Sequence, residues 1–396
     1  MTATPQVHVV ESAKKLTPEQ FRKLLVGPGV NQPDPYPGYT GFVGWVTPCL
    51  LESGRLIVSF SSGYWHASMP TPYRIKSETV KEYLDMGMPE VECPRGGRAE
   101  IIFSDDGGET WTRPTEMMDT ALDERHPSCI EVDDEVLLCA YFEASGAEHD
   151  YHTRIIRSVD GGSTWTHTES LPSGLVADAA DGSFCRLDDG SLLLVVYGWA
   201  EEHEKYCLSV VRTDSTGATW EHISTIMSDI EQCEPGIAQL PDGRLVMISR
   251  PEGAIQWSSD RGVTWTEPVP MGMRMYECGL HVTPDGTLVC MAGFYNSGDA
   301  NGVRVILSRD GGETWIAPAT NTGFEVDHVA YGYSRGIVLS DGSIYVTYQT
   351  TGGHGTEDAA NMRINAIRFR VNGDDLELLP GVIPEGVRPY RPDRVG

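Results

Sequence analysis

The sequence is poor in positive charge and has no long apolar run. It contains 30 Lys and Arg against 57 Asp and Glu, which gives a formal net charge of −27. Nucleic acids and anionic membranes are bound through basic surfaces, so we expect neither as a partner. No apolar run is long enough to span a membrane, and the first residues lack the apolar core of a signal peptide. We therefore expect a cytoplasmic protein, although a secreted chain with its leader trimmed would look the same.

Cysteine is present in an odd number, nine, which argues against a framework of disulfides. Six of the cysteines fall in or beside apolar, strand-like runs: Cys49, Cys129, Cys139, Cys185, Cys207 and Cys290. We expect buried free thiols at these positions. His149 and His152 lie beside acidic residues, which is one way to begin a metal site. No further cluster of Cys or His lies nearby in the sequence, so we expect no metal and no cofactor.

One octet, S-x-D-x-G-x-T-W, recurs about every 50 residues, a period that indicates a repeat architecture. Four copies begin at Ser104, Ser158, Ser258 and Ser308. A variant copy begins at Thr213 and has Ser215 in place of the Asp. Asp and Ser side chains bond nearby backbone N–H groups in turns, Gly adopts a positive φ, and Thr-Trp favours the start of a strand. We therefore interpret the octet as a hairpin turn that serves the fold.

A second motif consists of two apolar strands joined by a turn, as in IAQLPDGRLVMISR, and it occurs six times. An octet hairpin follows five of the copies, and after the sixth we expect MRINAIRFRV to form the last pair of strands. Six units of four strands predict an all-β chain, a six-bladed β-propeller with four-stranded antiparallel blades, as a single domain over 1–396. Within it, 1–40 would be an N-terminal extension whose strand at 6–10 closes the ring. A long insertion at 61–98, with a short helix at 77–86, would lie near the channel mouth.

The six turns provide a common reference for the strands that line the channel of a propeller. The turn residues are Gly54, Asp134, Gly190, Gly243, Gly286 and Gly342. The residues nine positions earlier are Trp45, Arg125, Asp181, Glu234, Glu277 and Tyr333. Since each first strand starts at the same end of the channel, we expect these six side chains to form a ring there. Five of them are polar or ionisable, and convergent polar groups in a concavity predict a ligand site.

Two further residues are candidate substrate ligands. Arg250 closes an apolar strand on the same hairpin as Glu234, and the planar fork of Arg binds carboxylates well. His66 lies in the insertion near the predicted channel mouth. With the ring, they make up a predicted site in which Asp181 is a candidate catalytic residue, and Arg125, Glu277 and Trp45 contact the substrate.

The octet is the Asp-box, and five copies in one chain resemble the sialidase (neuraminidase) superfamily. The stretch CEPGIAQLPDGRLVMISR, which contains Glu234 and Arg250, resembles the part of those enzymes that holds a catalytic Glu and the second Arg of a triad. Tyr333 lies in YGYSRGIVLSDGSIYVTYQ, which is similar to the stretch of the nucleophilic Tyr. Arg304 precedes the fifth box, as the third triad Arg does. The resemblance implies Tyr333 as nucleophile, Glu234 as its base and an Arg cluster for a carboxylate.

The sequence departs from that family at the first Arg of the triad. The motif F/Y-R-I-P reads Trp45-Val46-Thr47-Pro48 here, so Val46 stands where the Arg is expected. The long insertion occupies the region of the acid/base Asp, which cannot be placed. Arg125, one blade further on, is the candidate to supply the missing guanidinium. Whether the site recognises sialic acid itself therefore stays open.

Three functions are compatible with these residues. The first is a sialidase-like exoglycosidase that hydrolyses a terminal acidic sugar. A sialoside carries a carboxylate on its anomeric carbon, so a neutral Tyr suits the attack better than a carboxylate would. The second is a lyase or another glycosidase on a uronic-acid-containing glycan. In the lyase, Arg250 and Arg125 neutralise the carboxylate and Tyr333 or a His removes the proton. The third is a non-catalytic propeller that binds glycans or protein.

Overall fold

A computed structural model describes most of the chain as strands and turns. The described residues are 4–11, 16–32, 42–63, 96–145, 147, 149–295, 302–352 and 361–394. His66 and the helix predicted at 77–86 lie outside these ranges. The helices that are described are two 3₁₀ turns, η1 (Pro18–Gln20) and η3 (Pro392–Arg394). In the same ranges, no helix has the length and apolar character needed to cross a membrane.

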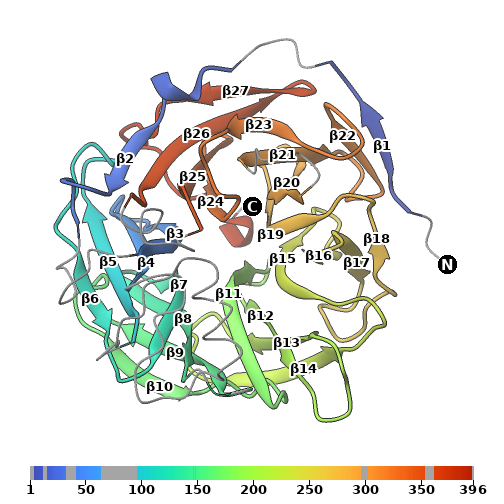
Figure 1. The fold of residues 1–396 in the computed structure, drawn as a ribbon, viewed down its shortest axis with the longest axis horizontal. Coiled ribbons are helices and arrows are strands. Elements are labelled where there is room, and N and C mark those ends of the chain that lie inside the picture. Colours follow the sequence, from blue (N-terminus) through green and yellow to red (C-terminus); the bar gives the residue numbers. More distant parts are fainter. Residues whose placement is uncertain are drawn as a thin grey trace.

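The described strands form six antiparallel sheets arranged as blades around a central axis (Figure 1). Blade 1 contains β3 (Phe42–Leu50), β4 (Leu56–Gly63), β5 (Arg98–Ser104) and β6 (Thr115–Met118). Blade 2 contains β7 (Asp123–Asp133), β8 (Val136–Ala144), β9 (Tyr151–Ser158) and β10 (Thr166–Ser170). Blade 3 contains β11 (Ala177–Arg186), β12 (Leu192–Trp199), β13 (Cys207–Thr213) and β14 (Trp220–Ile226).

The second half of the ring repeats the same order. Blade 4 contains β15 (Cys233–Gln239), β16 (Leu245–Arg250), β17 (Ala254–Ser258) and β18 (Val269–Pro270). Blade 5 contains β19 (Met275–Val282), β20 (Leu288–Phe294), β21 (Val303–Ser308) and β22 (Thr314–Ala317), with β23 (Phe324–Asp327) paired to β21. Blade 6 contains β24 (Ser334–Val338), β25 (Ser343–Gln349), β26 (Ile364–Asn372) and β27 (Asp375–Leu379). The predicted all-β, six-bladed propeller is therefore confirmed.

The Asp-box forms the turn between the third and fourth strands of blades 1 to 5. In the first box, the Oγ of Ser104 accepts a hydrogen bond from the backbone N–H of Gly108 at 2.7 Å. The carboxylate of Asp106 accepts from the backbone N–H and the hydroxyl of Thr110. The indole of Trp111 donates to the Gly108 carbonyl at 3.1 Å. The Ser and Asp bonds recur in the other three intact boxes, so the octet serves the turn as predicted.

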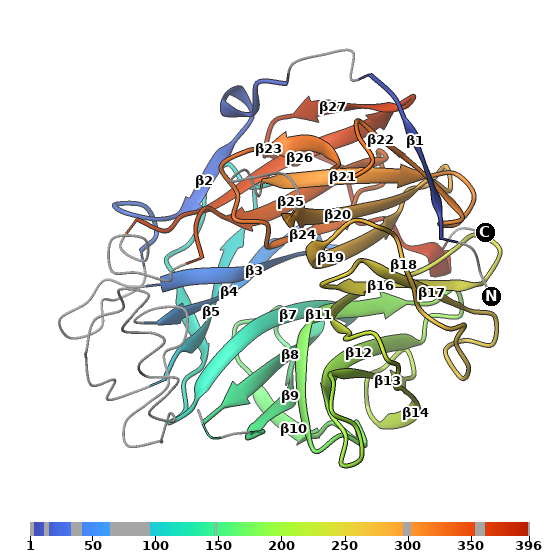
Figure 2. The ribbon, with the colours of Figure 1, turned by 45° about the vertical axis from the view of Figure 1, so that its right-hand side comes forward.

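The N-terminal strands lie at the outside of the ring. β1 (Gln6–Val9) runs parallel to β22 along the outer edge of blade 5, and β2 (Lys23–Val26) pairs with β26 of blade 6 (Figures 1 and 2). The strand predicted at 6–10 exists, but the prediction that it closes the ring is wrong. Each blade is built from consecutive strands, and the ring closes where β3 packs against β24 and β25. The predicted pair of strands in MRINAIRFRV is instead part of the single strand β26, which pairs with β25 and β27.

Apolar side chains from neighbouring blades fill the space between the sheets. Between blades 1 and 2, Ile57 and Ile101 pack in one buried cluster with Leu137 and Ile156. A sheet covered on both faces has near-continuous apolar strands, which explains the runs seen in the sequence. The eight described cysteines are all free, and all but the half-buried Cys233 are buried in this packing. The prediction of buried free thiols at six of these positions is confirmed.

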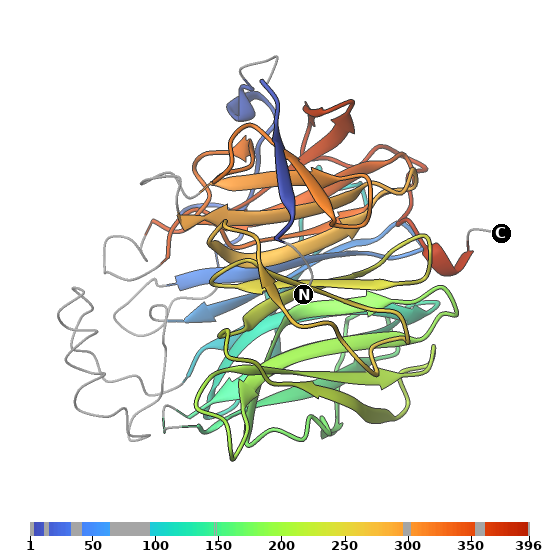
Figure 3. The same ribbon diagram turned by 90° about the vertical axis from the view of Figure 1, so that its right-hand side faces the viewer.

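The C-terminal segment covers one end of the channel. Pro389 forms a bridge with Leu339, and the backbone N–H of Tyr390 donates to the carbonyl of Val338 at 2.8 Å. The last described element, η3, consequently lies near the central axis in Figure 1 and on one face of the ring in Figure 3. Those contacts lie beside Gly342, in the turn between β24 and β25 of blade 6. The first strands of the blades therefore begin at the opposite end of the channel.

Candidate functional site

The first strands of several blades bulge where they enter the channel. Pairing with the second strand shifts register at the predicted ring positions in β3, β15 and β19. Trp45, Glu234 and Glu277 there have φ of 50°, 44° and 25°, a left-handed backbone that non-glycine residues rarely adopt. Each such residue costs about 1–3 kcal/mol, and strain of this kind concentrates at functional sites. The bulges hold these side chains near the starts of the first strands, which line the channel.

In blade 2 the ring position is occupied by His126, one residue later than predicted. The turn residue with positive φ is Glu135 (55°), not Asp134. Glu135 follows the paired Glu131 by four residues, as Gly54 follows the paired Leu50 in blade 1, so Glu135 takes the place of the glycine. Counting nine positions back from Glu135 leads to His126, which also has a positive φ of 54°. Its ring stacks on Trp45 with 4.8 Å between centroids and lies 6.0 Å from the ring of Tyr333.

Arg125 points to a different set of contacts. Its Nε donates to the carboxylate of Asp123 at 2.7 Å, and its guanidinium lies 5.2 Å from the ring centroid of Trp45. The charge of Arg125 is therefore paired with Asp123.

Tyr333, Glu234 and Arg250 meet at the start of the channel. The hydroxyl of Tyr333 donates to Oε1 of Glu234 at 2.9 Å. Nη1 of Arg250 donates to Oε2 of Glu234 at 2.6 Å and to the hydroxyl of Tyr333 at 2.9 Å. Nη2 of Arg250 donates to the hydroxyl of Tyr295 at 2.9 Å. The phenol oxygen thus has a carboxylate to receive its proton and a guanidinium to stabilise its negative charge.

Burial controls the protonation of this group. Tyr333 and Glu234 are each only 7% exposed. Burial, together with the charge of Glu234, raises the pKa of Tyr333 well above its ordinary value, while Arg250 opposes that shift. Burial alone would lower the pKa of Arg250, but the charges of Glu234 and Tyr333 outweigh it and raise the pKa. At rest the group therefore holds a neutral phenol beside a permanently charged guanidinium.

Arg335 forms a second layer beneath this group and was not among the predicted site residues. Its Nε lies 2.9 Å from Oε1 of Glu277, and its Nη2 lies 3.1 Å from Oδ2 of Asp181. Nη2 also donates to the carbonyl of Asp181 at 2.6 Å. Arg335 thereby connects blades 3, 5 and 6 across the channel. It follows Tyr333 by two residues, and this spacing, which places two residues on one face of an extended segment, is the signal that could have pointed to it.

The two predicted acids of this layer, Asp181 and Glu277, are 1% and 2% exposed. Burial raises the pKa of Glu277 to about 8, against the opposing charge of Arg335. Asp181 and Glu277 therefore contact Arg335, and the structure brings Glu234, Arg250 and Tyr333 together above them.

Tyrosine rings line one side of the candidate site. Tyr276 stacks on Tyr295 with centroids 3.7 Å apart, and the guanidinium of Arg250 lies 5.6 Å from the centroid of Tyr276. The rings of Tyr331 and Tyr333 are nearly parallel, 3° apart in angle and 6.2 Å in centroid distance. Flat apolar faces next to a charged centre suit a ligand with both hydrocarbon faces and polar groups, such as a sugar.

Comparison with known proteins agrees with this picture. The family model of the BNR repeat-like domain matches residues 94–346, more than half of the chain. The chain belongs to this family. A search of curated proteins finds no match.

Solved structures share the fold of this BNR-repeat protein at low sequence identity. A protein of unknown function from Dyadobacter fermentans has a TM-score of 0.66 and 17% identity, over 89% of this chain and 98% of the other. The Hadza microbial sialidase Hz136 has a TM-score of 0.62 and 16% identity, over 86% and 66%. The intramolecular trans-sialidase from Ruminococcus gnavus, solved with oseltamivir carboxylate, has a TM-score of 0.58 and 14% identity, over 83% and 94%. The resemblance to the sialidase superfamily is thus supported at the level of the fold.

Arg304, the third arginine predicted to converge, has other partners in this BNR-repeat protein. Its Nη2 donates to Oε2 of Glu325 at 3.1 Å and its Nη1 to the carbonyl of Gly323 at 3.4 Å. Of Arg125, Arg250 and Arg304, only Arg250 contacts Tyr333 or Glu234 within the described residues.

The structure does not assemble a metal site from His149 and His152. In the part of the chain that is described, no three or more His, Cys, Asp and Glu side chains are grouped so as to hold a metal ion. His149 instead packs against Trp199 with ring centroids 4.6 Å apart, and Nε2 of His152 lies 3.7 Å from Asp150.

Proposed function

We propose that this BNR-repeat protein is a retaining glycoside hydrolase of the sialidase type, which removes a terminal acidic sugar, sialic acid or a relative of it. The observation that carries the proposal is the hydroxyl of Tyr333, held 2.9 Å from Glu234 and 2.9 Å from Arg250. A nucleophile in hydrogen-bond contact with its base, with a third group orienting both, is the arrangement required for covalent catalysis.

In the proposed first step, the oxygen of Tyr333 attacks the anomeric carbon of the sugar while its proton passes to Glu234. The bond to the leaving oxygen breaks, and the electron pair departs with that oxygen. In the second step a water attacks the same carbon, the bond to Tyr333 breaks, and Glu234 returns its proton to the phenolate, while the proton that the water loses neutralises the departed oxygen. Two displacements at one carbon give net retention of configuration.

The acidic substrate follows from the chemistry of the nucleophile and from Arg250. A carboxylate on the anomeric carbon repels an anionic nucleophile, and a phenol that loses its proton only during attack avoids this repulsion. The side chain of Arg250 is 23% exposed, so a substrate can reach it. Its planar guanidinium suits a carboxylate, which would take over hydrogen bonds that Arg250 now makes to protein oxygens.

We further propose that Asp181 and Glu277 position the site and do not transfer protons to the substrate. Both are buried, at 1% and 2% exposure, and contact Arg335 in the layer beneath Tyr333, so neither lies where it could reach a substrate. Arg335 in turn fixes β24, the strand that directly follows Tyr333.

A panel of 4-methylumbelliferyl glycosides of sialic acid, hexuronic acids and neutral hexoses tests the proposal. The phenolate leaving group needs no proton, so the test is independent of the general acid. We expect the acidic glycosides to be cleaved, with the first-formed sugar in the retained configuration by ¹H NMR. An inverted product, or cleavage of neutral hexosides alone, would contradict the proposal. A uronic-acid oligosaccharide is added to the panel to detect a lyase, whose unsaturated uronide product would be seen by ultraviolet absorbance. Binding without turnover would identify a non-catalytic propeller.

A further inference from the structure

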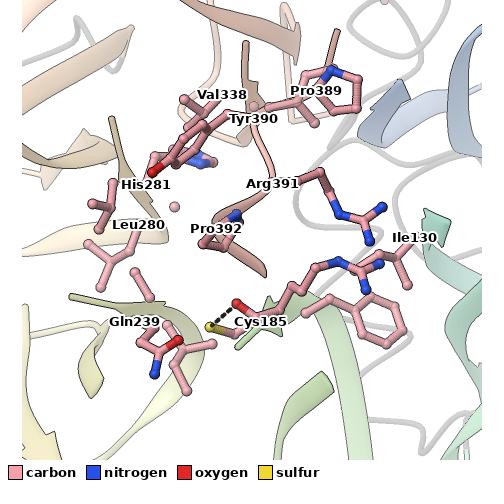
Figure 4. A pocket seen from close by; sticks show the side chains of 18 of the residues that line it. Ile130, Cys185, Gln239, Leu280, His281, Val338, Pro389, Tyr390, Arg391 and Pro392 are labelled. Carbon is pink, nitrogen blue, oxygen red and sulfur yellow. Dashed lines mark hydrogen bonds between the residues drawn. The ribbon is translucent and has the colours of Figure 1, made fainter. Parts of the chain in front are cut away.

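A cavity of about 560 Å³ lies at the other end of the channel, where the proposed hydrolase does no chemistry. It is lined by the turn-side halves of the first strands and by the C-terminal segment, from Pro389 to Pro392 (Figure 4). Pockets of several hundred Å³ hold small organic ligands in many proteins. Arg335 also lines it, so the layer that Arg335 forms with Asp181 and Glu277 separates the cavity from Tyr333.

Much of the cavity wall is apolar. Ile130, Leu280 and Val338 face it from blades 2, 5 and 6, and they surround the C-terminal segment in Figure 4. Ile237 and Ile337 add to the same wall. A ligand for this cavity therefore needs an apolar body, because polar groups placed against such side chains would lose hydrogen bonds to water.

The charged lining of the cavity has more cations than anions. It consists of Arg186, Arg335, Arg391, Glu131 and Asp188. Both carboxylates are engaged away from it: Glu131 accepts from the backbone N–H of Glu52 at 2.9 Å, and Asp188 pairs with Arg261 at 2.9 Å. In a chain with a net charge of −27, a cavity with three guanidinium groups is a local reversal of charge.

Arg186 differs from the other two arginines because it lacks a carboxylate partner. Arg335 pairs with Asp181 and Glu277, and Arg391 pairs with Asp393 through two bonds of 3.0 Å. The guanidinium of Arg186 donates to the carbonyls of Glu131 and Gly190. No carboxylate in the described part of the chain lies within 4.0 Å of it.

The surroundings of Arg186 disfavour its charge. Burial, followed by the nearby charge of Arg391, lowers the pKa of Arg186 to about 10 against the opposing charges of Asp393 and Glu131, so it still carries its charge at neutral pH. A partly buried cation with only carbonyl acceptors and a second cation nearby is stabilised by an added anion. Nε2 of His281, on the same cavity wall, is buried and has no hydrogen-bond partner among the described residues, which leaves a further polar contact unfilled.

We propose that this cavity binds a small organic acid, whose apolar body packs on the strand walls and whose carboxylate pairs with Arg186. The proposed site is separate from Tyr333, Glu234 and Arg250, and its preference for an anion comes from Arg186. The proposal does not depend on the hydrolase activity, and its test requires no turnover.

The test measures binding of benzoate and hexanoate to the full-length protein by isothermal titration calorimetry. Benzyl alcohol and hexanol serve as neutral analogues, and inorganic phosphate as an anion without an apolar body. We expect the two carboxylates to bind more tightly than either their neutral analogues or phosphate. Arg186→Gln should weaken benzoate binding at least about tenfold, because a charge-assisted bond is lost, and should leave benzyl alcohol unchanged. Arg186→Lys should fall between, since it keeps the charge without the fork.

Two controls make the outcome decisive. Arg212→Gln removes an arginine that pairs with Glu221 at the surface and should leave benzoate binding unchanged. Tyr333→Phe should also bind benzoate as the wild type does, which separates this site from the proposed catalytic one. The proposal is overturned if the wild type binds neither carboxylate, if phosphate binds as tightly as benzoate, or if folded Arg186→Gln and Arg186→Lys proteins both bind benzoate like the wild type.

Discussion

Equivalent positions of the blades hold the same residues at the rim of this propeller but different residues at its channel. At the rim, four intact Asp-boxes build the same turn with the same bonds, and their threonines hold the pKa of Asp106, Asp160 and Asp260 below the usual range. At the channel, the six ring positions hold five different kinds of residue: Trp45, His126, Asp181, Glu234, Glu277 and Tyr333. Equivalent positions that hold the same residue in several blades serve folding. Equivalent positions that hold different residues are free to take part in binding or catalysis.

Removing the hydroxyl of Tyr333 should have the largest effect. Tyr333→Phe keeps the ring packed but removes the proposed nucleophile, so we expect turnover of an acidic aryl glycoside to fall by several orders of magnitude, about a thousandfold or more. Stability should change by only about 1 kcal/mol, the value of the lost hydrogen bonds. Steady-state kinetics and thermal unfolding on the same preparation measure both. Near wild-type turnover would show that this part of the channel serves structure, as the rim does.

Arg250 offers a smaller and more specific test. Arg250→Lys retains a charge but cannot bridge Glu234, Tyr333 and a substrate carboxylate together, so we expect kcat/KM to drop about 100-fold. Arg304→Lys is the matched comparison, because Arg304 bonds to Glu325 and Gly323, and we expect a loss below about tenfold. Equal losses in the two variants would mean that both guanidinium groups meet the substrate.

The layer beneath the site should make the stability of the protein depend on pH through Glu277. Burial raises the pKa of Glu277 from 4.5 to about 8, so between these values the folded protein keeps a proton that the unfolded chain has lost. This group therefore makes stability fall as the pH rises through that window, by at most about 1.4 kcal/mol per pH unit.

Glu277→Gln has no proton to lose, so its thermal midpoint should depend less on pH between about 5 and 8 than that of the wild type. Glu267→Gln, at an exposed position in a rim turn, is the control and should keep the wild-type dependence. Identical curves for wild type and Glu277→Gln would show that Glu277 is ionised throughout this range.

The smallest effect should come from the rim. Asp310 accepts the backbone N–H and the hydroxyl of Thr314, next to the fully buried Trp315. Asp310→Ala should cost about 1–2 kcal/mol of stability by urea unfolding, as the loss of a turn cap does, and leave kcat unchanged. Ser215 occupies the same position in the variant box, where Asp214 bonds Thr216 instead. Ser215→Ala should therefore change stability by less than about 0.5 kcal/mol, and an equal loss would show that the variant turn relies on the same position.

The blades could be predicted because their signals are local. An Asp-box bonds within a few residues, and a hairpin is specified by its turn and its two apolar strands. The prediction failed in blade 2 for a local reason as well. CIEVDDEVLLCAYF has no Gly to mark the residue of positive φ, so the sequence predicts Asp134 and Arg125 where the structure has Glu135 and His126.

What the sequence by itself determined is the number of blades, the turns that carry a glycine, and the placement of Glu234, Arg250 and Tyr333 at or beside the ends of strands. Only the tertiary structure decided what these residues touch. Tyr333 and Glu234 are 99 positions apart, and their hydrogen bond depends on how the ring closes and on bulges that rotate side chains into it. The pairing of Arg335 with two other blades and the position of the C-terminal segment over the cavity depend on the same closure. Contacts between blades have no period in the chain, because they are set by packing in three dimensions.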